Sequence, residues 1–133
     1  MSTTPRKPQE FAHFPQALQA WAKFGPYAAI VRTVIDADTV DVLADLGFST
    51  YTYQTLRLRG IDAPERNTPA GKTARAFLWD LLPVGTPCVV TTHRTVTFGR
   101  YVADLHILSP GTGLLLDVAQ HLISVGHARS YLP

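Results

Sequence analysis

Disulfides, membrane spans and strong net charge are all missing from this sequence, and each absence excludes something. Among 133 residues there is one cysteine, Cys88, so no disulfide can form within the chain and packing must stabilise the fold. No window is long and apolar enough to span a membrane. The formal net charge of +2 permits a polyanionic partner without demanding one, because non-specific binding of nucleic acid needs many clustered phosphate contacts.

Ligand patterns for zinc are missing as well. No pair of cysteines exists, and the histidines are scattered without the spacing that a tetrahedral zinc site requires. Any metal is therefore expected to be held by oxygen ligands. The five histidines are His13, His93, His106, His121 and His127.

The cellular compartment and the oligomeric state are predicted only from what the sequence lacks. No apolar stretch follows the polar start of the chain, so a signal peptide is not evident and the chain as written is expected in the cytoplasm. A secreted protein whose signal segment is missing would have the same sequence. We expect a monomer that does not contact membranes.

Three regions are expected along the chain. Residues 1–10 are rich in Ser, Thr and Pro with few apolar side chains, which predicts disorder. A short helix or flap is expected over residues 11–26, where apolar residues recur at i, i+4 and i+7 before Gly25-Pro26. This helix is expected to pack on the domain, and the alternative is a helix that binds a partner. Residues 27–133 are predicted to form the folded domain.

Short strands dominate that domain. Three runs with β-branched and aromatic residues in alternation precede a helix that begins at Thr68-Pro69. Two further strands and a helix capped by Asp117 follow. The order predicts an α+β, mostly β fold, namely a five-stranded OB-fold barrel with a helix between strands 3 and 4 and a C-terminal helix. The predicted strands are residues 27–34, 39–47, 50–62, 88–97 and 101–108.

Charged residues gather in three local clusters. Asp36-Ala37-Asp38-Thr39 lies between the first two strands, where aspartate is common simply because it favours turns. Leu56–Glu65 carries two arginines and then two carboxylates around Pro64, and alone it could be a strand with a solvated charged edge. Phe98-Gly99-Arg100-Tyr101 is ordinary turn chemistry by itself.

Together the clusters suit phosphodiester hydrolysis. Ca²⁺ takes oxygen ligands, and two aspartates with a carbonyl leave room for water and a phosphate oxygen. Arginine forks match phosphate oxygens bidentately and stay charged at working pH. The combined set of two aspartates, one glutamate and two arginines therefore has a candidate for each role in cutting a phosphodiester.

Four motifs in this order resemble the micrococcal (staphylococcal) nuclease family. They are Val34–Val40, Arg57–Glu65, Phe98–Arg100 and Gly126–Ala128, and the resemblance runs over residues 27–131. It implies an OB-fold barrel and a Ca²⁺-dependent nuclease. Such an enzyme cleaves DNA and RNA, with single strands preferred, and leaves 3′-phosphates. For this chain we expect endonucleolytic cutting.

The resemblance also implies roles for single residues. Asp38 and Asp62 would hold Ca²⁺ by their carboxylates and Ala63 by its backbone carbonyl. Glu65 would accept a proton from the attacking water or orient it.

Two arginines, Arg57 and Arg100, would grip the phosphate and its transition state electrostatically, because a guanidinium is a poor proton donor. Arg59 is the rival of Arg57, but the spacing to Asp62 favours Arg57. Phe98 and Arg59 are assigned to substrate binding.

Some positions depart from the family pattern. Ala37 stands where glycine is common in the calcium loop, and Ala63 stands where the best-known member has threonine. Thr97-Phe98 replaces a Lys-Tyr pair, and residues 66–68 lack a basic loop. These changes bear on exonuclease and base preference rather than on hydrolysis. The sequence does not separate Ca²⁺ from a related divalent ion.

Another class of function stays open. A catalytically inert OB-fold module would bind single-stranded nucleic acid or a protein partner without cutting. Such a module needs basic grooves with aromatic platforms, and Tyr51, Tyr53 and Tyr101 could supply the aromatics. A domain that docks a partner through its N-terminal helix is the third possibility. The full set of charged residues favours the enzyme.

Overall fold

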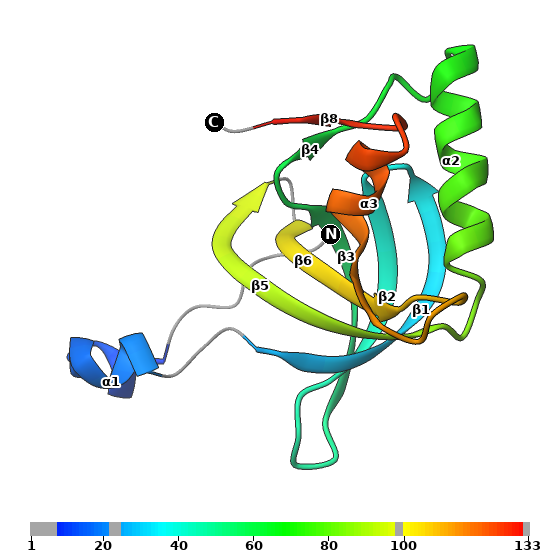
Figure 1. The fold of residues 1–133 in the computed structure, drawn as a ribbon. Coiled ribbons are helices and arrows are strands. Elements are labelled where there is room, and N and C mark those ends of the chain that lie inside the picture. The colour runs from blue at the N-terminus through cyan, green and yellow to red at the C-terminus, as the bar shows by residue number, and fades with distance from the viewer. Residues whose placement is uncertain (1–7, 22–24, 98–99, 132–133) are drawn as a thin grey trace.

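A closed barrel of five strands forms the body of the protein in a computed structural model that describes residues 8–21, 25–97 and 100–131 (Figure 1). The predicted α+β, mostly β fold is confirmed. The barrel strands are β1 (Tyr27–Asp36), β2 (Thr39–Asp45), β3 (Tyr51–Leu58), β5 (Pro87–Thr97) and β6 (Arg100–Leu108).

Strand pairing gives the OB-fold order. Antiparallel pairs run β3–β2–β1–β5–β6, and a parallel pairing of β3 with β6 closes the barrel. That closing pair sets Arg57 beside Val102, and the β2–β3 pair sets Arg57 beside Thr39. Because the end of β3 is shared by both partners, the charged motif that follows it lies at the junction of β2 and β6.

Buried and exposed side chains alternate along the strands and give the barrel an inner and an outer face. In β2, Val40 and Val42 face inward and are fully buried, while Asp41 between them is half-buried on the outer wall. A continuous apolar core therefore fills the barrel and extends under the two helices. Its largest fully buried side chains are Val31, Val34, Val40, Val42, Leu56, Leu58, Ile61, Leu78, Leu82, Val90, Leu105 and Leu122.

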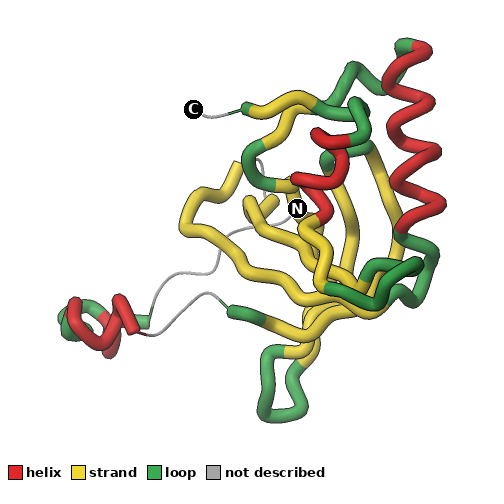
Figure 2. The backbone as a smooth tube through the Cα atoms, in the orientation of Figure 1, coloured by secondary structure: helices red, strands yellow, loops and turns green. Residues whose placement is uncertain are grey.

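Both predicted helices of the domain are present. Helix α2 (Pro69–Leu81) follows the third barrel strand, and the Thr68 hydroxyl accepts a hydrogen bond from the Gly71 amide as its N-cap. Helix α3 (Val118–Ser124) is capped by Asp117, which accepts from the Gln120 amide. Figure 2 shows the two helices on one side of the barrel.

Several short elements were not predicted. The sequence suggested one strand over residues 50–62, but Gly60 takes φ +81° and splits off β4 (Ile61–Asp62). Strands β7 (Leu115–Asp117) and β8 (Arg129–Ser130) and the 3₁₀ turn η1 (Gln9–Phe11) were also missed. Two or three residues are too few to show an alternating pattern, so local sequence could not predict them.

The N-terminal helix was predicted and is observed as α1 (Gln16–Trp21). Figure 1 shows it apart from the barrel. Phe14 and Leu18 are exposed. Its packing on the domain stays a prediction. Residues 1–7 of the expected disordered start lie outside the described residues. No helix in the described ranges is long and apolar enough to cross a membrane.

Cys88 should be chemically inert in the folded protein. Its side chain lies in the core at 6% exposure, and desolvation by burial raises the pKa of the thiol to about 12. Only ~10⁻⁴ of the thiol would be thiolate at pH 8, and the thiolate is the reactive form. We therefore expect negligible labelling by Ellman's reagent at pH 8 and complete labelling in denaturant. Rapid labelling of the native protein would contradict this burial.

Candidate functional site

Asp38 lies in the tight turn between β1 and β2, with its side chain turned toward the end of β3. Its carboxylate accepts hydrogen bonds from the Thr39 hydroxyl (3.0 Å) and from the Ala63 amide (3.3 Å). The backbone of the turn is tied down as well, because the Leu58 amide donates to the Asp38 carbonyl at 2.8 Å. The turn and the segment after β3 thus form one unit.

Ala37 explains how this turn forms without the expected glycine. Its methyl group is buried at 3% exposure. Positive φ among the described non-glycine residues occurs at Phe48 and Ser49, so Ala37 does not need the left-handed backbone that favours glycine. This departure from the family pattern therefore leaves the turn intact.

Arg57 joins the two predicted metal-binding carboxylates. Its guanidinium forms an ion pair with Asp38 through Nη1, and its Nη2 lies 3.9 Å from Asp62 Oδ1. The Arg57 side chain is about 29% exposed and that of Asp38 about 15%, so the pairs are partly shielded from water. Three predicted site residues that are up to 24 positions apart in sequence therefore meet at one place.

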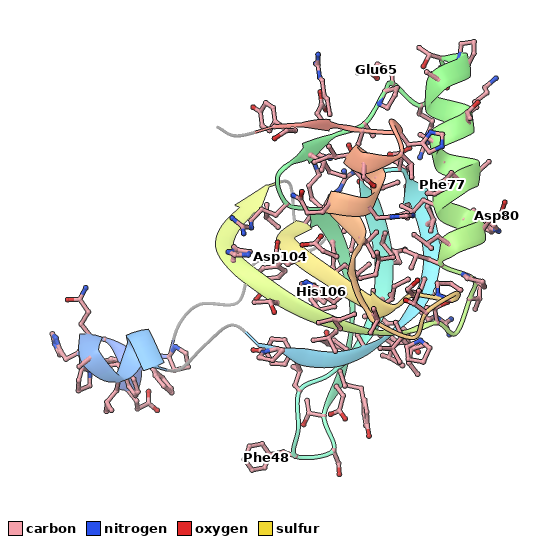
Figure 3. All side chains as sticks on the ribbon, viewed as in Figure 1. Phe48, Glu65, Phe77, Asp80, Asp104 and His106 are labelled. Atoms are coloured by element: carbon pink, nitrogen blue, oxygen red, sulfur yellow. The ribbon has the colours of Figure 1, made fainter. Side chains whose placement is uncertain are left out.

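Glu65 follows on a loop that is anchored by the start of α2. The amide and hydroxyl of Thr68 both donate to the Glu65 carbonyl, at 3.0 and 2.7 Å. The side chain is exposed, and it lines a hollow of about 430 Å³ together with Asp62 and Ala63. Figure 3 shows Glu65 on the outer side of this loop, beside the first turn of α2.

Gly71 is a residue whose importance the sequence did not reveal. A Cβ at this position would lie 1.8 Å from the Glu65 carbonyl oxygen and 3.1 Å from that of Pro64. No real Cβ approaches so closely, so the loop that carries Glu65 can pack on α2 only because residue 71 is glycine. The backbone position of Glu65, from which its carboxylate side chain extends, therefore depends on glycine at position 71.

Gly71→Ala is expected to lower the free energy of unfolding by about 1–3 kcal/mol, because overpacking outweighs the helix propensity that alanine adds. The displaced loop should also lower turnover. Urea denaturation and a cleavage assay would measure both effects. Gly111→Ala is the matched control, since nothing lies within 4 Å of a Cβ there. A Gly71→Ala protein as stable as wild type would contradict the packing described.

The remaining predicted residues are placed less closely. Arg100 is exposed at the first position of β6, which brings it to the strand that pairs with the end of β3. Phe98 lies outside the described residues. Arg59 pairs with Asp104 rather than with Asp38 or Asp62, with its Nε 3.1 Å from Asp104 Oδ1. This engagement favours Arg57 over Arg59 as the arginine of the carboxylate pair.

The carboxylate of Asp104, on the barrel wall in β6 (Figure 3), binds His93 and Arg59. His93 Nε2 lies 2.9 Å from its Oδ2, and Arg59 holds the other oxygen. Burial works to raise the pKa of Asp104, but the hydrogen bonds and charges of His93 and Arg59 lower it below its usual value. The cluster is a structural one on the outer wall, and the sequence did not predict it.

The free energy of unfolding should depend on pH through the ionisation of Asp104. A lowered pKa in the folded state means that the carboxylate stabilises the fold above its ordinary pKa of about 3.9, and that this contribution is lost as pH falls through the lower folded value. Asp104→Asn should therefore cost about 0.5–1 kcal/mol at pH 7 and progressively less as pH falls below about 3.9. Urea denaturation at pH 7, 5 and 3 would show it. A cost independent of pH would contradict this role.

The oxygen donors at the site fit a hard divalent cation. Asp38 and Asp62 are drawn together around Arg57, and Ala63 lies beside both. Within the described ranges no three His, Cys, Asp or Glu side chains form a group that could hold a metal. Two carboxylates and a carbonyl would leave the rest of the coordination sphere, about three to five oxygen ligands for Ca²⁺, to water and substrate.

Two further arginines at the site were not predicted from the sequence. Arg129 Nη2 lies 3.2 Å from Asp62 Oδ2, and Arg66 Nε lies 2.8 Å from Asp36 Oδ1. Neither has a motif of its own. The one available signal was that Arg66 and Arg129 each directly follow a matched motif, at Glu65 and Ala128.

Two aspartates, a glutamate and arginines thus gather near the end of the third strand of an OB-fold barrel. The chain is 34% identical over 73 residues to the "Probable staphylococcal-like nuclease CAN2" of Oryza sativa subsp. japonica. That similarity covers 55% of the chain and 18% of the rice protein.

A second relative is the "Uncharacterized 38.1 kDa protein" of Capnoides sempervirens, which is 29% identical over 110 residues. This covers 74% of the chain and 32% of the relative, so the chain spans a third or less of the length of both relatives. No family model matches the chain. The barrel and the rice similarity together fit a nuclease-like protein.

Proposed function

We propose that this protein is a Ca²⁺-dependent nuclease that hydrolyses phosphodiester bonds in DNA and RNA by endonucleolytic cutting and leaves 3′-phosphates. The observation that carries the proposal is the convergence of Asp38, Arg57 and Asp62 beside the anchored Glu65. A purely structural ion pair would not require a second aspartate at the same guanidinium, nor an exposed glutamate on a fixed loop next to it.

Each side chain has a task in this proposal. Asp38 and Asp62, with the Ala63 carbonyl, would hold the cation, which when bound polarises the phosphate and lowers the charge repulsion that a nucleophile meets. Glu65 orients the attacking water and takes its proton. Arg57 and Arg100 bind the phosphate oxygens, where negative charge is concentrated in the transition state.

A polymeric nucleic acid suits the surface next to the site. On α2, Lys72 and Arg75 share one face with Trp79, and Arg66, which follows Glu65 in sequence, lines the same hollow. The Arg75 guanidinium lies over the Trp79 ring at 5.1 Å, and Trp79 is about 43% exposed. Alternating cations and an exposed aromatic are typical of surfaces that bind single strands by phosphate contacts and base stacking.

The alternative is an inert OB-fold module that binds single-stranded nucleic acid or a protein partner. One observation favours it: the chain spans only 18% of the rice relative, so the catalytic function of that protein need not lie in the matched part. Arg32 also lies over the Tyr53 ring at 5.4 Å, which is a second site for stacking on the barrel. Binding without cleavage would be the outcome in this case.

Cleavage of a single-stranded DNA oligonucleotide in millimolar Ca²⁺, compared with excess chelator, tests the proposal. We expect cutting that depends on Ca²⁺ and products that end in a 3′-phosphate, which phosphatase treatment would reveal. A site variant purified in parallel excludes a contaminating nuclease. Folded protein that binds the oligonucleotide in Ca²⁺ without cutting it would overturn the nuclease and support the inert module.

A further inference from the structure

Arg129 is brought to the site by the last strand of the described chain. Strand β8 pairs antiparallel with β4, so that Arg129 lies directly opposite Asp62. The Tyr131 amide donates to the Gly60 carbonyl at 2.8 Å and extends the pairing by one residue. The position of Arg129 is therefore set by the pairing of β8 with β4 and by the hydrogen bond to Gly60.

The Asp62 carboxylate is shared between two arginines. Its Oδ1 faces Arg57 at 3.9 Å, and its Oδ2 accepts from Arg129 Nη2 at 3.2 Å. The two pairs differ in exposure, because the Arg129 side chain is about 82% exposed and that of Arg57 about 29%. An exposed pair is weak and readily exchanged, so Arg129 is the partner that Asp62 can release.

The side chain of Arg129 is exposed to solvent beside the other site residues. The residue lines the hollow of about 430 Å³ that also contains Asp62 and Glu65, so its guanidinium and the candidate water-handling carboxylate share one space. Guanidinium groups bind phosphate oxygens bidentately. Arg129 approaches this hollow from β8, whereas Arg57 approaches Asp62 from the end of β3.

We propose that Arg129 is a positioning residue that exchanges partners. It holds the Asp62 carboxylate before the cation binds, and when the cation takes Asp62 it turns to a phosphate of the nucleic-acid strand. The proposal rests on the proposed function and adds a residue and a coupling to it. Arg129 opposes cation binding alone and favours substrate binding once the cation is present, so cation and nucleic acid bind cooperatively.

A simpler role would be structural. Oppositely charged residues directly across two strands stabilise the pairing by a few tenths of a kcal/mol up to about 1 kcal/mol. In that case removal of Arg129 would loosen β8 and leave the affinity for the cation unchanged or lower. The exchange predicts the opposite sign, which makes the two roles separable by binding measurements alone.

Arg129→Gln is the test variant, and two binding assays report on it. The rise of Tm with Ca²⁺ concentration gives a Ca²⁺ dissociation constant without nucleic acid. Here we expect Arg129→Gln to bind Ca²⁺ about two- to fivefold more tightly than wild type, since a competing exposed ion pair is removed. Fluorescence anisotropy of a labelled single-stranded oligonucleotide in saturating Ca²⁺ should show weaker binding and a salt slope reduced by about one.

Two controls separate this exchange from general effects of charge or strand pairing. Lys72→Gln removes an exposed positive charge from α2 and is the control for the Ca²⁺ assay alone: it should not tighten Ca²⁺ binding, whereas its place on the α2 surface should weaken oligonucleotide binding. Ser130→Ala alters the same strand and should change neither assay. Ca²⁺ affinity in Arg129→Gln equal to or weaker than wild type would overturn the exchange. Wild-type protein that binds no Ca²⁺ would overturn the proposed function too, whereas Ca²⁺ binding that Arg129→Gln leaves unchanged overturns the exchange alone.

Discussion

Glu65→Gln is expected to lower turnover on single-stranded DNA by about 10²–10⁴-fold in saturating Ca²⁺. Glutamine keeps the size of the side chain but cannot accept a proton from water at neutral pH. The fold should be unaffected, because the Glu65 side chain is exposed and the loop is held through its carbonyl rather than its carboxylate. Single-turnover cleavage, with Tm as the check on folding, measures the effect.

Asp80→Asn is the matched control for this prediction. Asp80 is an exposed carboxylate near the end of α2, well separated from Glu65 in Figure 3, and the change again replaces an acid by its amide. It should leave turnover within a few fold of wild type. If Glu65→Gln cut as fast as wild type, another group would have to handle the water, even if the protein proved to be a nuclease.

Arg57→Ala should have the second large effect, a loss of about 10²–10³-fold in rate, because one preorganised donor to the transition state disappears. The free energy of unfolding should fall as well, because Asp38 and Asp62 would repel each other without the Arg57 guanidinium between them. Added Ca²⁺ should restore part of that stability by replacing the lost charge. Cleavage kinetics and the Tm with and without Ca²⁺ measure these two consequences.

Arg59→Ala distinguishes the two arginines of the motif. Arg59 is paired with Asp104 on the barrel wall, so its removal should cost a modest amount of stability and leave cleavage within a few fold of wild type. A large loss in Arg59→Ala together with a small loss in Arg57→Ala would transfer the phosphate-binding role to Arg59. Arg57→Lys should remain slow, because an ammonium group cannot bridge carboxylates and phosphate in a planar fork.

Much of the fold could be read from the sequence. Alternation in runs such as Val40–Val42, and helix signals such as Thr68-Pro69 and Asp117, are local, and hydrogen bonds between near neighbours enforce them. The order of five strands with an intervening helix was therefore predictable. The local motifs Asp36–Thr39 and Arg57–Glu65 likewise placed most candidate site residues in two short segments.

What the sequence could not determine was which side chains meet. The choice between Arg57 and Arg59, both on the same strand end, depends on where Asp38 and Asp104 lie after the barrel closes. The close approach of Gly71 to the Glu65 carbonyl depends on how α2 packs on its own N-terminal loop.

The ion pair of Arg129 is the clearest contact that the sequence could not predict. Its contact with Asp62 spans 67 positions and is made by a strand of two residues, which has no periodicity to recognise. By itself the sequence determined the barrel and the chemical inventory of the site, because local periodicity and turn chemistry encode them. Only the tertiary structure decided the partners of each charge, because long-range strand pairing and helix packing set those distances.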